Sequence, residues 1–344
     1  MNQNTTIYKE IFKSVESIIG DVYMVGGSVR DIIMGKIPLD YDFCTPIHPE
    51  EVEKRIRAAG KRPYLIGKKY GTVGFKDRGQ FIEITTFRHE RYESNNRKPH
   101  VDYVSDLRSD LERRDFTINA IAMKVIDDKI EYIDPTGGGR DIGARLINQV
   151  GDAEERIIED PLRMLRAARF VSVLDFDIDK KLAGKIKKNA DKIYSVSKER
   201  WTSELEKLLM GTNPAKGLQV LADTELLRYI LPELWLQIDY DQNTPYHRLT
   251  LWEHTKKVVS LSNNDIEMRW AALLHDVGKP FAKKKNVRGY SSYYLHNKIG
   301  AEIARDITLR LKLPKARIEN IFHLVDTHME DGNPLRKADN GAKA

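Results

Sequence analysis

Cysteine is nearly absent from this chain of 344 residues, which contains only Cys44. A single thiol excludes an internal disulfide and any zinc site built on several thiolates. The sequence also lacks an apolar run of the roughly 18 residues that a membrane-spanning helix needs. Its first residues have no basic flank followed by a long apolar segment, which is the pattern of a secretory signal. These absences predict a cytoplasmic protein.

A strong excess of one charge is also missing, because 57 basic residues face 51 acidic ones and the formal net charge is +6. This mild excess permits a polyanionic partner without requiring one. A content of 41% hydrophobic and 31% charged residues is typical of a folded protein. Because 344 residues exceed one ordinary core, we expect two or more domains.

The first part of the chain alternates short apolar segments with helical patterns. Residues 21–27 and 40–45 are predicted to be short strands, and residues 72–88 a β-hairpin that turns at "DRG". Residues 88–102 are polar, basic and aperiodic, which predicts a mobile loop. The alternation predicts a small α/β or α+β domain, of which we favour α+β with a small mixed sheet.

Helical periodicity dominates after Gly151. Residues 153–174 are predicted to form one long helix, and further segments of helix length follow up to residue 329. The last residues, 330–344, are polar and are expected to fray. We therefore predict that the second part of the chain is all-α.

Two aspartates follow a glycine-rich turn in "GGSVRD" and "DYD". Asp40 and Asp42 lie on the same side of the predicted strand, where two carboxylates repel each other unless a cation lies between them. Mg²⁺ prefers such oxygen ligands together with substrate phosphates. Glycines such as Gly27 let backbone N–H groups approach a phosphate, Arg30 can add a charge-assisted contact, and Glu83 can supply a third carboxylate. The alternative is a surface turn with solvated acids.

Basic residues recur every three positions in "EDPLRMLRAARF", residues 159–170. On a helix, Asp160, Arg163, Arg166 and Arg169 would form one stripe. Asp160 accepts and Arg163 donates hydrogen bonds, as the Watson–Crick edge of cytosine or adenine requires. Uracil and guanine would leave groups unpaired, at about 1–3 kcal/mol each. Arg166 and Arg169 can hold a triphosphate; the alternative is a solvated basic stripe.

A histidine–aspartate pair stands in "HDVGK", residues 275–279. His275 and Asp276, with His254 from a neighbouring helix, can bind one or two divalent ions. His296 and either Asp326 or His328 can complete the set. The segment resembles an HD phosphohydrolase domain, and either a catalytic site or a scaffold facing RNA is compatible with it.

The motifs together resemble the class II tRNA nucleotidyltransferases, which comprise the CCA-adding enzymes and their poly(A) polymerase relatives within the DNA polymerase β-like superfamily. Besides the two motifs above, "RRDFTINAIAM" (113–123) resembles the motif that links metal site and nucleotide, and "SKERWTSELEKLL" (197–209) the neck helix. The resemblance implies a polymerase β-like head, a helical neck and body, an HD-like domain and a polar tail, with bounds 1–147, 148–212, 213–245, 246–332 and 333–344.

This resemblance implies template-independent, Mg²⁺-dependent addition of CCA from CTP and ATP to the 3′ end of tRNA. The full-length loop at 88–102, with Arg88, Arg91, Arg97 and Lys98, favours completion with A. The metal ligands that the resemblance implies are Asp40 and Asp42. The implied nucleotide-binding residues are Gly27, Arg30, Arg113, Asp160, Arg163, Arg166 and Arg169.

Several alternatives stay open. Within the class they are A-only addition, CC-only addition and poly(A) polymerase activity, the last of which usually comes with a longer basic tail. From other classes they are an HD phosphohydrolase whose head only binds RNA, and a non-catalytic RNA-binding protein. Relatives often continue into a helical tail that reaches the tRNA elbow, so we expect either a reduced grip on tRNA or a shortened chain. The oligomeric state is left open.

Overall fold

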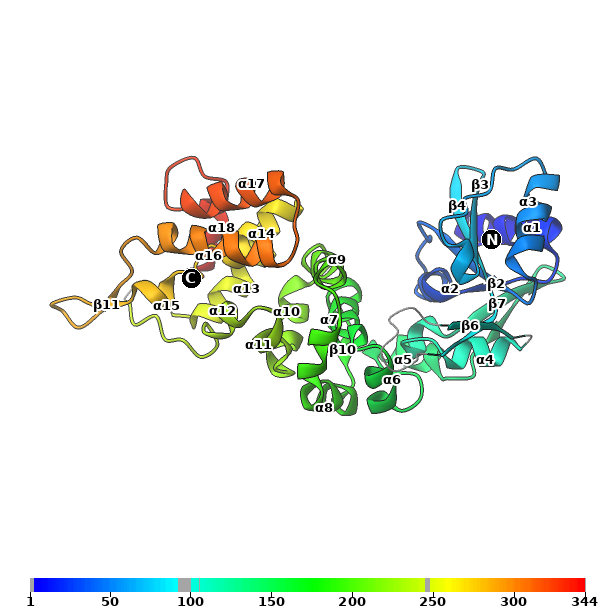
Figure 1. Ribbon diagram of the computed structural model, residues 1–344, viewed down its shortest axis with the longest axis horizontal. Helices are drawn as coiled ribbons and strands as arrows, with labels where there is room; N and C mark the ends of the chain where they lie inside the picture. The colour runs from blue at the N-terminus through cyan, green and yellow to red at the C-terminus, as the bar shows by residue number, and fades with distance from the viewer. Residues whose placement is uncertain (1–2, 92–99, 105, 245–247, 344) are drawn as a thin grey trace. The chain divides into compact units, whose positions relative to one another are not determined.

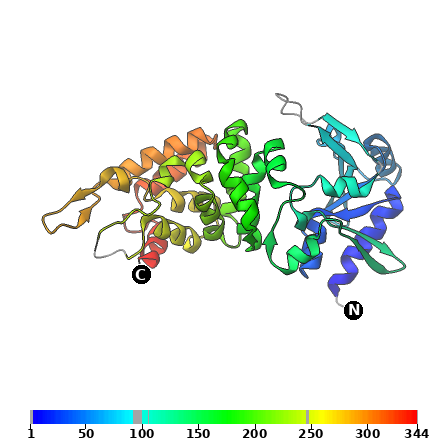
Figure 2. The ribbon, with the colours of Figure 1, turned by 90° about the horizontal axis from the view of Figure 1, so that it is seen from below.

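The computed structural model describes residues 3–91, 100–104, 106–244 and 248–343 (Figures 1 and 2). The chain divides into two compact units, Met1–Ala153 and Glu154–Ala344. The first unit combines a small mixed sheet with helices and the second is almost entirely helical, which confirms the predicted fold class. No helix among the described residues is long and apolar enough to cross a membrane.

A six-stranded sheet forms the centre of the first unit, and all its neighbouring strands are antiparallel except one parallel pair. Side chains such as Met24, Phe43 and Ile84 are buried against it. In spatial order its strands are β3 (Thr72–Asp77), β4 (Gln80–Thr86), β2 (Tyr41–Thr45), β1 (Tyr23–Val25), β7 (Ala122–Ile126) and β8 (Lys129–Ile133).

The parallel pair is β2 with β4, and its register sets Asp42 beside Glu83. The predicted hairpin at residues 72–88 is formed by β3 and β4. It turns at Arg78 and Gly79, which both have positive φ, the conformation that tight hairpin turns require. The strands predicted at residues 21–27 and 40–45 are β1 and β2.

Helices cover the sheet, and two of them, α1 (Gln3–Ile19) and α3 (Pro49–Ala58), also pack against each other. Helix α3 begins at Pro49, carries acids in its first turn and arginines in its last, and buries Val52 and Ile56, as expected for an amphipathic helix. The other elements are α2 (Gly26–Ile33), which packs on β1, β2 and β7, then α4 (Leu107–Glu112), α5 (Gly138–Gly143), η1 (Lys68–Tyr70), η2 (Thr117–Asn119) and β9 (Leu146–Ile147).

The prediction of a mobile loop at residues 88–102 is partly wrong. Two strands, β5 (Arg88–Arg91) and β6 (His100–Tyr103), pair antiparallel there. Backbone pairing orders these two short strands; β5 is polar throughout, and the two apolar residues of β6, Val101 and Tyr103, are too few to reveal a strand. Residues 92–99, which include the cations Arg97 and Lys98, lie outside the described residues.

The prediction of one long helix at residues 153–174 is also wrong, because this segment forms two helices, α6 (Ala153–Glu159) and α7 (Leu162–Leu174). Pro161 disfavours helical backbone at the preceding residue, so Asp160 lies at the junction rather than on α7. The neighbouring elements are β10 (Asp177–Ile178), α8 (Lys180–Lys188), η3 (Ala190–Ser195), α9 (Lys198–Leu209), α10 (Pro214–Asp223), α11 (Leu226–Ile230) and α12 (Pro232–Trp235).

The remaining helices surround a second core that contains Trp270, Leu274 and Ile307. A short antiparallel hairpin interrupts them, which the all-α prediction missed. The elements are α13 (Leu251–Leu261), α14 (Ile266–Leu274), α15 (Lys279–Ala282), β11 (Lys284–Lys285), β12 (Ser291–Ser292), α16 (His296–Arg310), α17 (Lys315–Asp326) and α18 (Leu335–Ala342).

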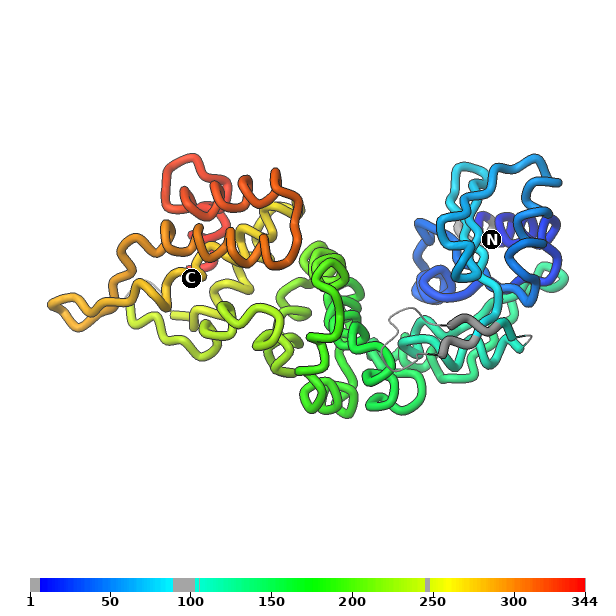
Figure 3. The backbone as a smooth tube through the Cα atoms, viewed as in Figure 1, coloured from blue at the N-terminus to red at the C-terminus, as the bar shows by residue number. Residues whose placement is uncertain are grey.

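The prediction that the polar tail frays is wrong. Helix α18 buries Leu335, Ala338, Asp339 and Ala342 and packs on α13 and α14. Figure 3 traces this last segment, in red, as part of the second unit. Its sparse apolar residues lie three and four positions apart, so they form one narrow face that only the tertiary packing buries.

Candidate active site and candidate metal centre

The turn between β1 and α2 depends on glycine. Gly26 has φ +70°, a left-handed conformation that side chains rarely adopt. A Cβ atom there would lie 3.3 Å from Nη1 of Arg114 and 3.4 Å from Oδ2 of Asp42. Glycine therefore allows both the turn and the close approach of these two side chains.

Ser28 joins this turn to the aspartate strand, a role that the sequence analysis missed. Its hydroxyl accepts a hydrogen bond from the Asp42 backbone N–H at 2.8 Å and donates one to the Asp40 carbonyl at 3.2 Å. The serine within "GGS" was the available signal, because a short hydroxyl side chain can bond to nearby backbone. The two bonds fix where the strand of Asp42 begins relative to α2.

Three carboxylates gather at this point. Asp42 and Glu83 are neighbours on adjacent strands, and Asp40 directly precedes β2. Burial, followed by the charges of Asp40 and Glu83, raises the pKa of Asp42 to about 6, against the opposing charges of Arg114 and Arg30. Burial and then Asp40 also raise the pKa of Glu83. The structure thus brings together the carboxylates that the sequence suggested.

This donor set fits a divalent cation. Carboxylate oxygens are the ligands that hard divalent cations prefer, and the raised pKa of Asp42 shows that its charged form lacks sufficient neutralisation. A cation bound between Asp40 and Asp42 would favour the charged form of both.

The arginines near the site are held by acids. Arg30 donates to Asp31 at 2.8 Å and to Asn119 at 2.8 Å. Arg113 and Arg114 both donate to the buried Asp110, at 2.6 and 3.1 Å. Burial raises the pKa of Asp110, but the charges of these two arginines outweigh it, so the pKa is lowered.

Arg114, which the sequence analysis did not select, acts on Asp42. Its charge lowers the pKa of Asp42, and its guanidinium lies beside Gly26. The sequence signal was the doubled arginine of "RRD", of which only the first was selected. The predicted Gly27 lies in the first turn of α2, where a Cβ atom would come within 3.4 Å of the Arg30 guanidinium.

The predicted base-reading residues lie at the start of α7. Asp160 accepts a hydrogen bond from Arg200 at 3.0 Å and from the Leu162 backbone N–H at 3.2 Å. Arg163 is buried and donates through Nη1 to the Arg156 carbonyl at 2.9 Å and to Glu159 at 3.1 Å. Asp160 and Arg163 therefore each have a protein partner besides the base that they were predicted to read. The sequence analysis missed these partners, Arg200 and Glu159.

The rest of the predicted basic stripe faces an acid. Arg169 lies 3.2 Å from Glu204 of α9, and Arg166 lies 3.7 Å from the same side chain. The guanidinium of Arg169 also lies over the ring of Phe170, at 3.9 Å from its centre. The alternative interpretation as a solvated basic stripe is therefore wrong for Arg169, because this side chain is buried against another helix.

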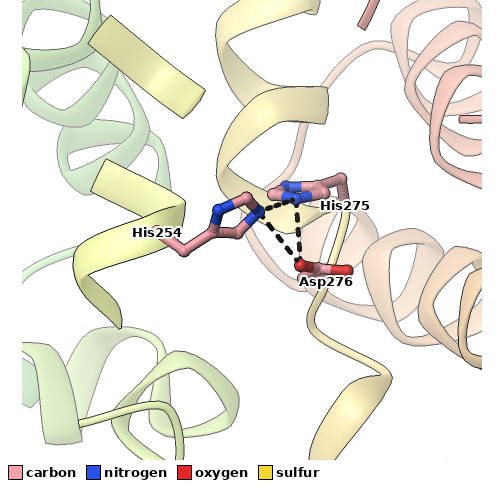
Figure 4. Close-up of side chains that lie close together, drawn as sticks. All are labelled: His254, His275 and Asp276. Atoms are coloured by element: carbon pink, nitrogen blue, oxygen red, sulfur yellow. Dashed lines mark hydrogen bonds and ion pairs between the residues drawn. The ribbon is translucent and has the colours of Figure 1, made fainter. Parts of the chain in front are cut away.

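A second cluster lies in the helical unit. Three of its side chains turn toward one another (Figure 4): His254 on α13, and His275 and Asp276, which are neighbours in sequence at the end of α14. Nε2 of His275 lies 3.3 Å from Nε2 of His254 and 3.1 Å from Oδ2 of Asp276. Nε2 of His296 lies 3.3 Å from Oδ1 of Asp276 and 3.2 Å from Nε2 of His328.

Backbone carbonyls orient three of these imidazoles. Nδ1 of His275, His296 and His328 lies 2.7–2.8 Å from the carbonyl of Ala272, Tyr293 and Val325 respectively. A hydrogen bond donated from Nδ1 places the Nε2 lone pair toward the centre of the cluster. Facing lone pairs repel one another, so this donor set fits one or two divalent ions.

The cluster contains one residue that the sequence analysis missed. Asp339 of α18 lies 3.1 Å from Nε2 of His254. Burial raises the pKa of Asp339, but the hydrogen bond from His254 and the charge of His275 outweigh it and lower the pKa. Of the two predicted alternatives, His328 belongs to the cluster, whereas Asp326 pairs with Lys298 at 2.7 Å. The histidine–aspartate cluster therefore comprises His254, His275, Asp276, His296, His328 and Asp339.

A cavity of about 270 Å³ opens beside this cluster. Lys279 contributes a cation to its wall and lies 2.7 Å from Asp276. Lys343 contributes another and lies 3.2 Å from Asp339. Hydroxyl groups of Thr244, Ser291, Ser292 and Tyr293 also line it. Cations and hydroxyls beside the histidine–aspartate cluster suit an anionic phosphate ester.

Close backbone packing holds the two halves of the cluster together. A Cβ atom at Gly278 would lie 2.2 Å from the His296 carbonyl oxygen and 2.6 Å from the Gly300 nitrogen. The glycine of "HDVGK" thus lets the turn after Asp276 approach α16. This approach brings His296 within reach of Asp276.

Known protein families match the segments of the chain that contain the two candidate sites. The Poly A polymerase head domain matches residues 22–148, the probable RNA and SrmB- binding site of polymerase A matches residues 175–238, and the HD domain matches residues 246–343. The first contains the three carboxylates and the last contains the histidine–aspartate cluster.

Relatives of high similarity share one name. The CCA-adding enzyme of Geobacillus stearothermophilus is 37% identical over 86% of this chain and 68% of that protein. The CCA-adding enzyme of Geobacillus kaustophilus is 44% identical over 61% of this chain and 50% of that protein. A crystal structure of the Bacillus stearothermophilus CCA-adding enzyme in complex with CTP is 30% identical, with a TM-score of 0.67 over 99% of this chain and 82% of that one.

The fold and the carboxylate site thus define a nucleotidyltransferase-type head that is followed by a helical unit with an HD domain. The chain belongs to the family of CCA-adding enzymes. It spans 50% to 64% of the length of several curated relatives that it matches.

Replacing Asp42→Asn should stabilise the metal-free protein at pH 7.5. Because burial and neighbouring acids raise the folded-state pKa to about 6, ionisation of Asp42 destabilises the fold as pH rises above its unfolded pKa. We expect the free energy of unfolding to increase by about 2 kcal/mol at pH 7.5, and the gain to shrink toward pH 4. Urea unfolding without divalent ions measures this, with the exposed Glu131→Gln as control. Equal stabilities at pH 7.5 would contradict the assigned electrostatics.

Replacing Gly278→Ala should weaken metal binding at the histidine–aspartate cluster. The added methyl forces the turn and α16 apart, at about 1–3 kcal/mol of stability. Mn²⁺-induced thermal stabilisation measures the effect, in a background of Asp40→Asn and Asp42→Asn that excludes the other site. The control is Gly184→Ala, where nothing lies within 4 Å of the added carbon. Unchanged stabilisation by Mn²⁺ in Gly278→Ala would show that this packing does not position His296.

Proposed function

We propose that this protein adds CCA to the 3′ end of tRNA from CTP and ATP without a nucleic-acid template. The observation that carries the proposal is the group of Asp40, Asp42 and Glu83 beside the glycine turn, in a head of the Poly A polymerase type. Family membership supports it, as does the CTP bound in a structure of 30% identity.

Asp40 and Asp42 would hold Mg²⁺, with Glu83 as a further carboxylate beside them. The bound ion supplies positive charge that lowers the pKa of the attacking 3′ hydroxyl and neutralises the departing pyrophosphate. Ser28 positions the strand of Asp42, and Arg114 limits the repulsion around it. Gly27, Arg30 and Arg113 would contact nucleotide phosphate or sugar.

The base would be selected by Asp160 and Arg163. Arg163 uses Nη1 for its two intramolecular bonds, so Nε and Nη2 stay available as donors. Each oxygen of Asp160 has two lone pairs, of which the bonds from Arg200 and Leu162 use only one each. Arg166 and Arg169 would hold the triphosphate, with Glu204 fixing their positions.

Extension of tRNA tests this function. Transcripts that end at the discriminator base, at C and at CC are incubated with labelled CTP or ATP. We expect C to be added to the first two and A to the last; addition of A alone, of C alone or of a poly(A) tract would identify the corresponding alternative. Asp40→Ala and Asp42→Ala should lower the rate by about 1,000-fold or more, since the metal contributes several kcal/mol. Glu131→Ala is the control, and retained addition in both aspartate variants would overturn the site.

A second proposed activity is metal-dependent phosphate ester hydrolysis at the histidine–aspartate cluster. Its support is the set of inward-facing Nε2 atoms beside a cavity with two lysines. We expect hydrolysis of p-nitrophenyl phosphate with Mn²⁺, and its loss in the His275→Ala, Asp276→Ala double variant. The matched control is His323→Ala, Asp326→Ala, which removes a histidine and an aspartate of α17 outside the cluster. If no divalent ion supports hydrolysis, the cluster is a scaffold.

A further inference from the structure

A two-stranded arm extends from the helical unit next to the cavity. Strand β11 pairs with β12, with Lys284 opposite Ser292 and Lys285 opposite Ser291. Figures 1 and 2 both show this segment projecting beyond the helices around it. We call residues 283–292 the hairpin arm; neither of the functions proposed above gives this arm a role.

The arm carries concentrated positive charge. Residues 279–290 include five cations and no acid. Every residue from 283 to 290 is exposed. Within the described part of the chain, Lys284, Lys285 and Arg288 have no ion pair. Lys283 bonds to the Asp241 carbonyl at 3.1 Å. These cations are therefore available to an anionic partner.

Aromatic rings accompany the charge. Tyr290 is 43% exposed at the end of the turn, and Tyr294, just beyond β12, is 81% exposed. Bases of single-stranded nucleic acid stack on such rings while the backbone phosphates contact cations. A lipid surface would instead call for a continuous apolar face, which the polar residues of the arm do not form.

The arm is continuous with the cavity wall. Ser291, Ser292 and Tyr293 line the cavity, and His296 of the cluster follows three residues later. The arm is also anchored at its base, because Ser291 N–H donates to the Asn243 carbonyl at 2.9 Å and the Asn243 side chain donates to the Gly289 carbonyl at 3.1 Å. A strand of nucleic acid on the arm would therefore reach the cavity with its end.

We propose that the hairpin arm binds the phosphate backbone of RNA and holds an RNA end in the cavity of the histidine–aspartate cluster. This inference rests on the phosphohydrolase activity proposed above and names its substrate class as a terminal phosphate ester of RNA. In the reaction, water adds to phosphorus and the bond from phosphorus to the ribose oxygen breaks. The products are inorganic phosphate and an RNA hydroxyl, and Lys279 and Lys343 face the phosphate.

The test compares two double variants of the full chain, Lys284→Ala with Lys285→Ala, and the exposed control pair Lys312→Ala with Lys315→Ala. A short fluorescent single-stranded RNA with a 3′ phosphate is the probe. For the arm variant we expect about fivefold weaker binding at low salt, and a slope of log affinity against log salt that is lower by about 1.4, since each phosphate contact contributes about 0.7. Dephosphorylation of the RNA should fall in parallel, while hydrolysis of p-nitrophenyl phosphate stays unchanged. The control pair should behave as the wild type.

Three results would overturn the inference. One is equal RNA affinity and salt slope in the arm and control variants. Another is an equal loss of p-nitrophenyl phosphate hydrolysis, which would make the arm a structural support of the cavity. The third is arm-dependent binding to phosphatidylserine vesicles without arm-dependent binding to RNA. If the wild type hydrolyses neither ester, the phosphohydrolase activity fails, whereas the binding comparison still decides whether the arm contacts RNA.

Discussion

Repulsion between like groups that the backbone holds close together is the constraint on which both candidate sites depend. In the head, the parallel register of β2 and β4 sets Asp42 beside Glu83, and Ser28 fixes the start of the same strand near Asp40. The burial and repulsion that raise the pKa of Asp42 are the reason the site favours a divalent cation. Arg114 reduces the repulsion only in part, because Asp110 also engages its charge.

The same constraint governs the histidine–aspartate cluster with different donors. Backbone carbonyls accept from Nδ1 of three imidazoles, so their Nε2 atoms converge on Asp276. The ends of α14 and α17, the start of α16 and the close approach at Gly278 hold this arrangement. A buried cluster of this kind is costly to a fold that makes no use of it, which is why we assign it an activity of its own rather than a supporting role for the head.

Local patterns predicted much of the head. Alternating apolar residues identified β2, β3 and β4, and period two placed Asp40 and Asp42 on one side of the predicted strand, whereas the pairing of Asp42 with Glu83 came only from the sheet register. The same approach failed at β5, which is polar throughout, at β6, which has only four residues, and at α18, whose few apolar residues looked like a frayed end. It also extended one helix through Asp160, although the following proline was visible in the sequence.

The sequence by itself determined the class of fold, the order of the motifs and the metal-ligand candidates, because turns, strand alternation and helix periodicity depend on residues close together in the chain. Only the tertiary structure decided the partners: Arg200 for Asp160, Glu204 for Arg169, and Asp339 for His254. Each of these pairs joins residues far apart along the chain. Their contacts follow from how helices pack, and a local pattern holds no information about packing between distant segments.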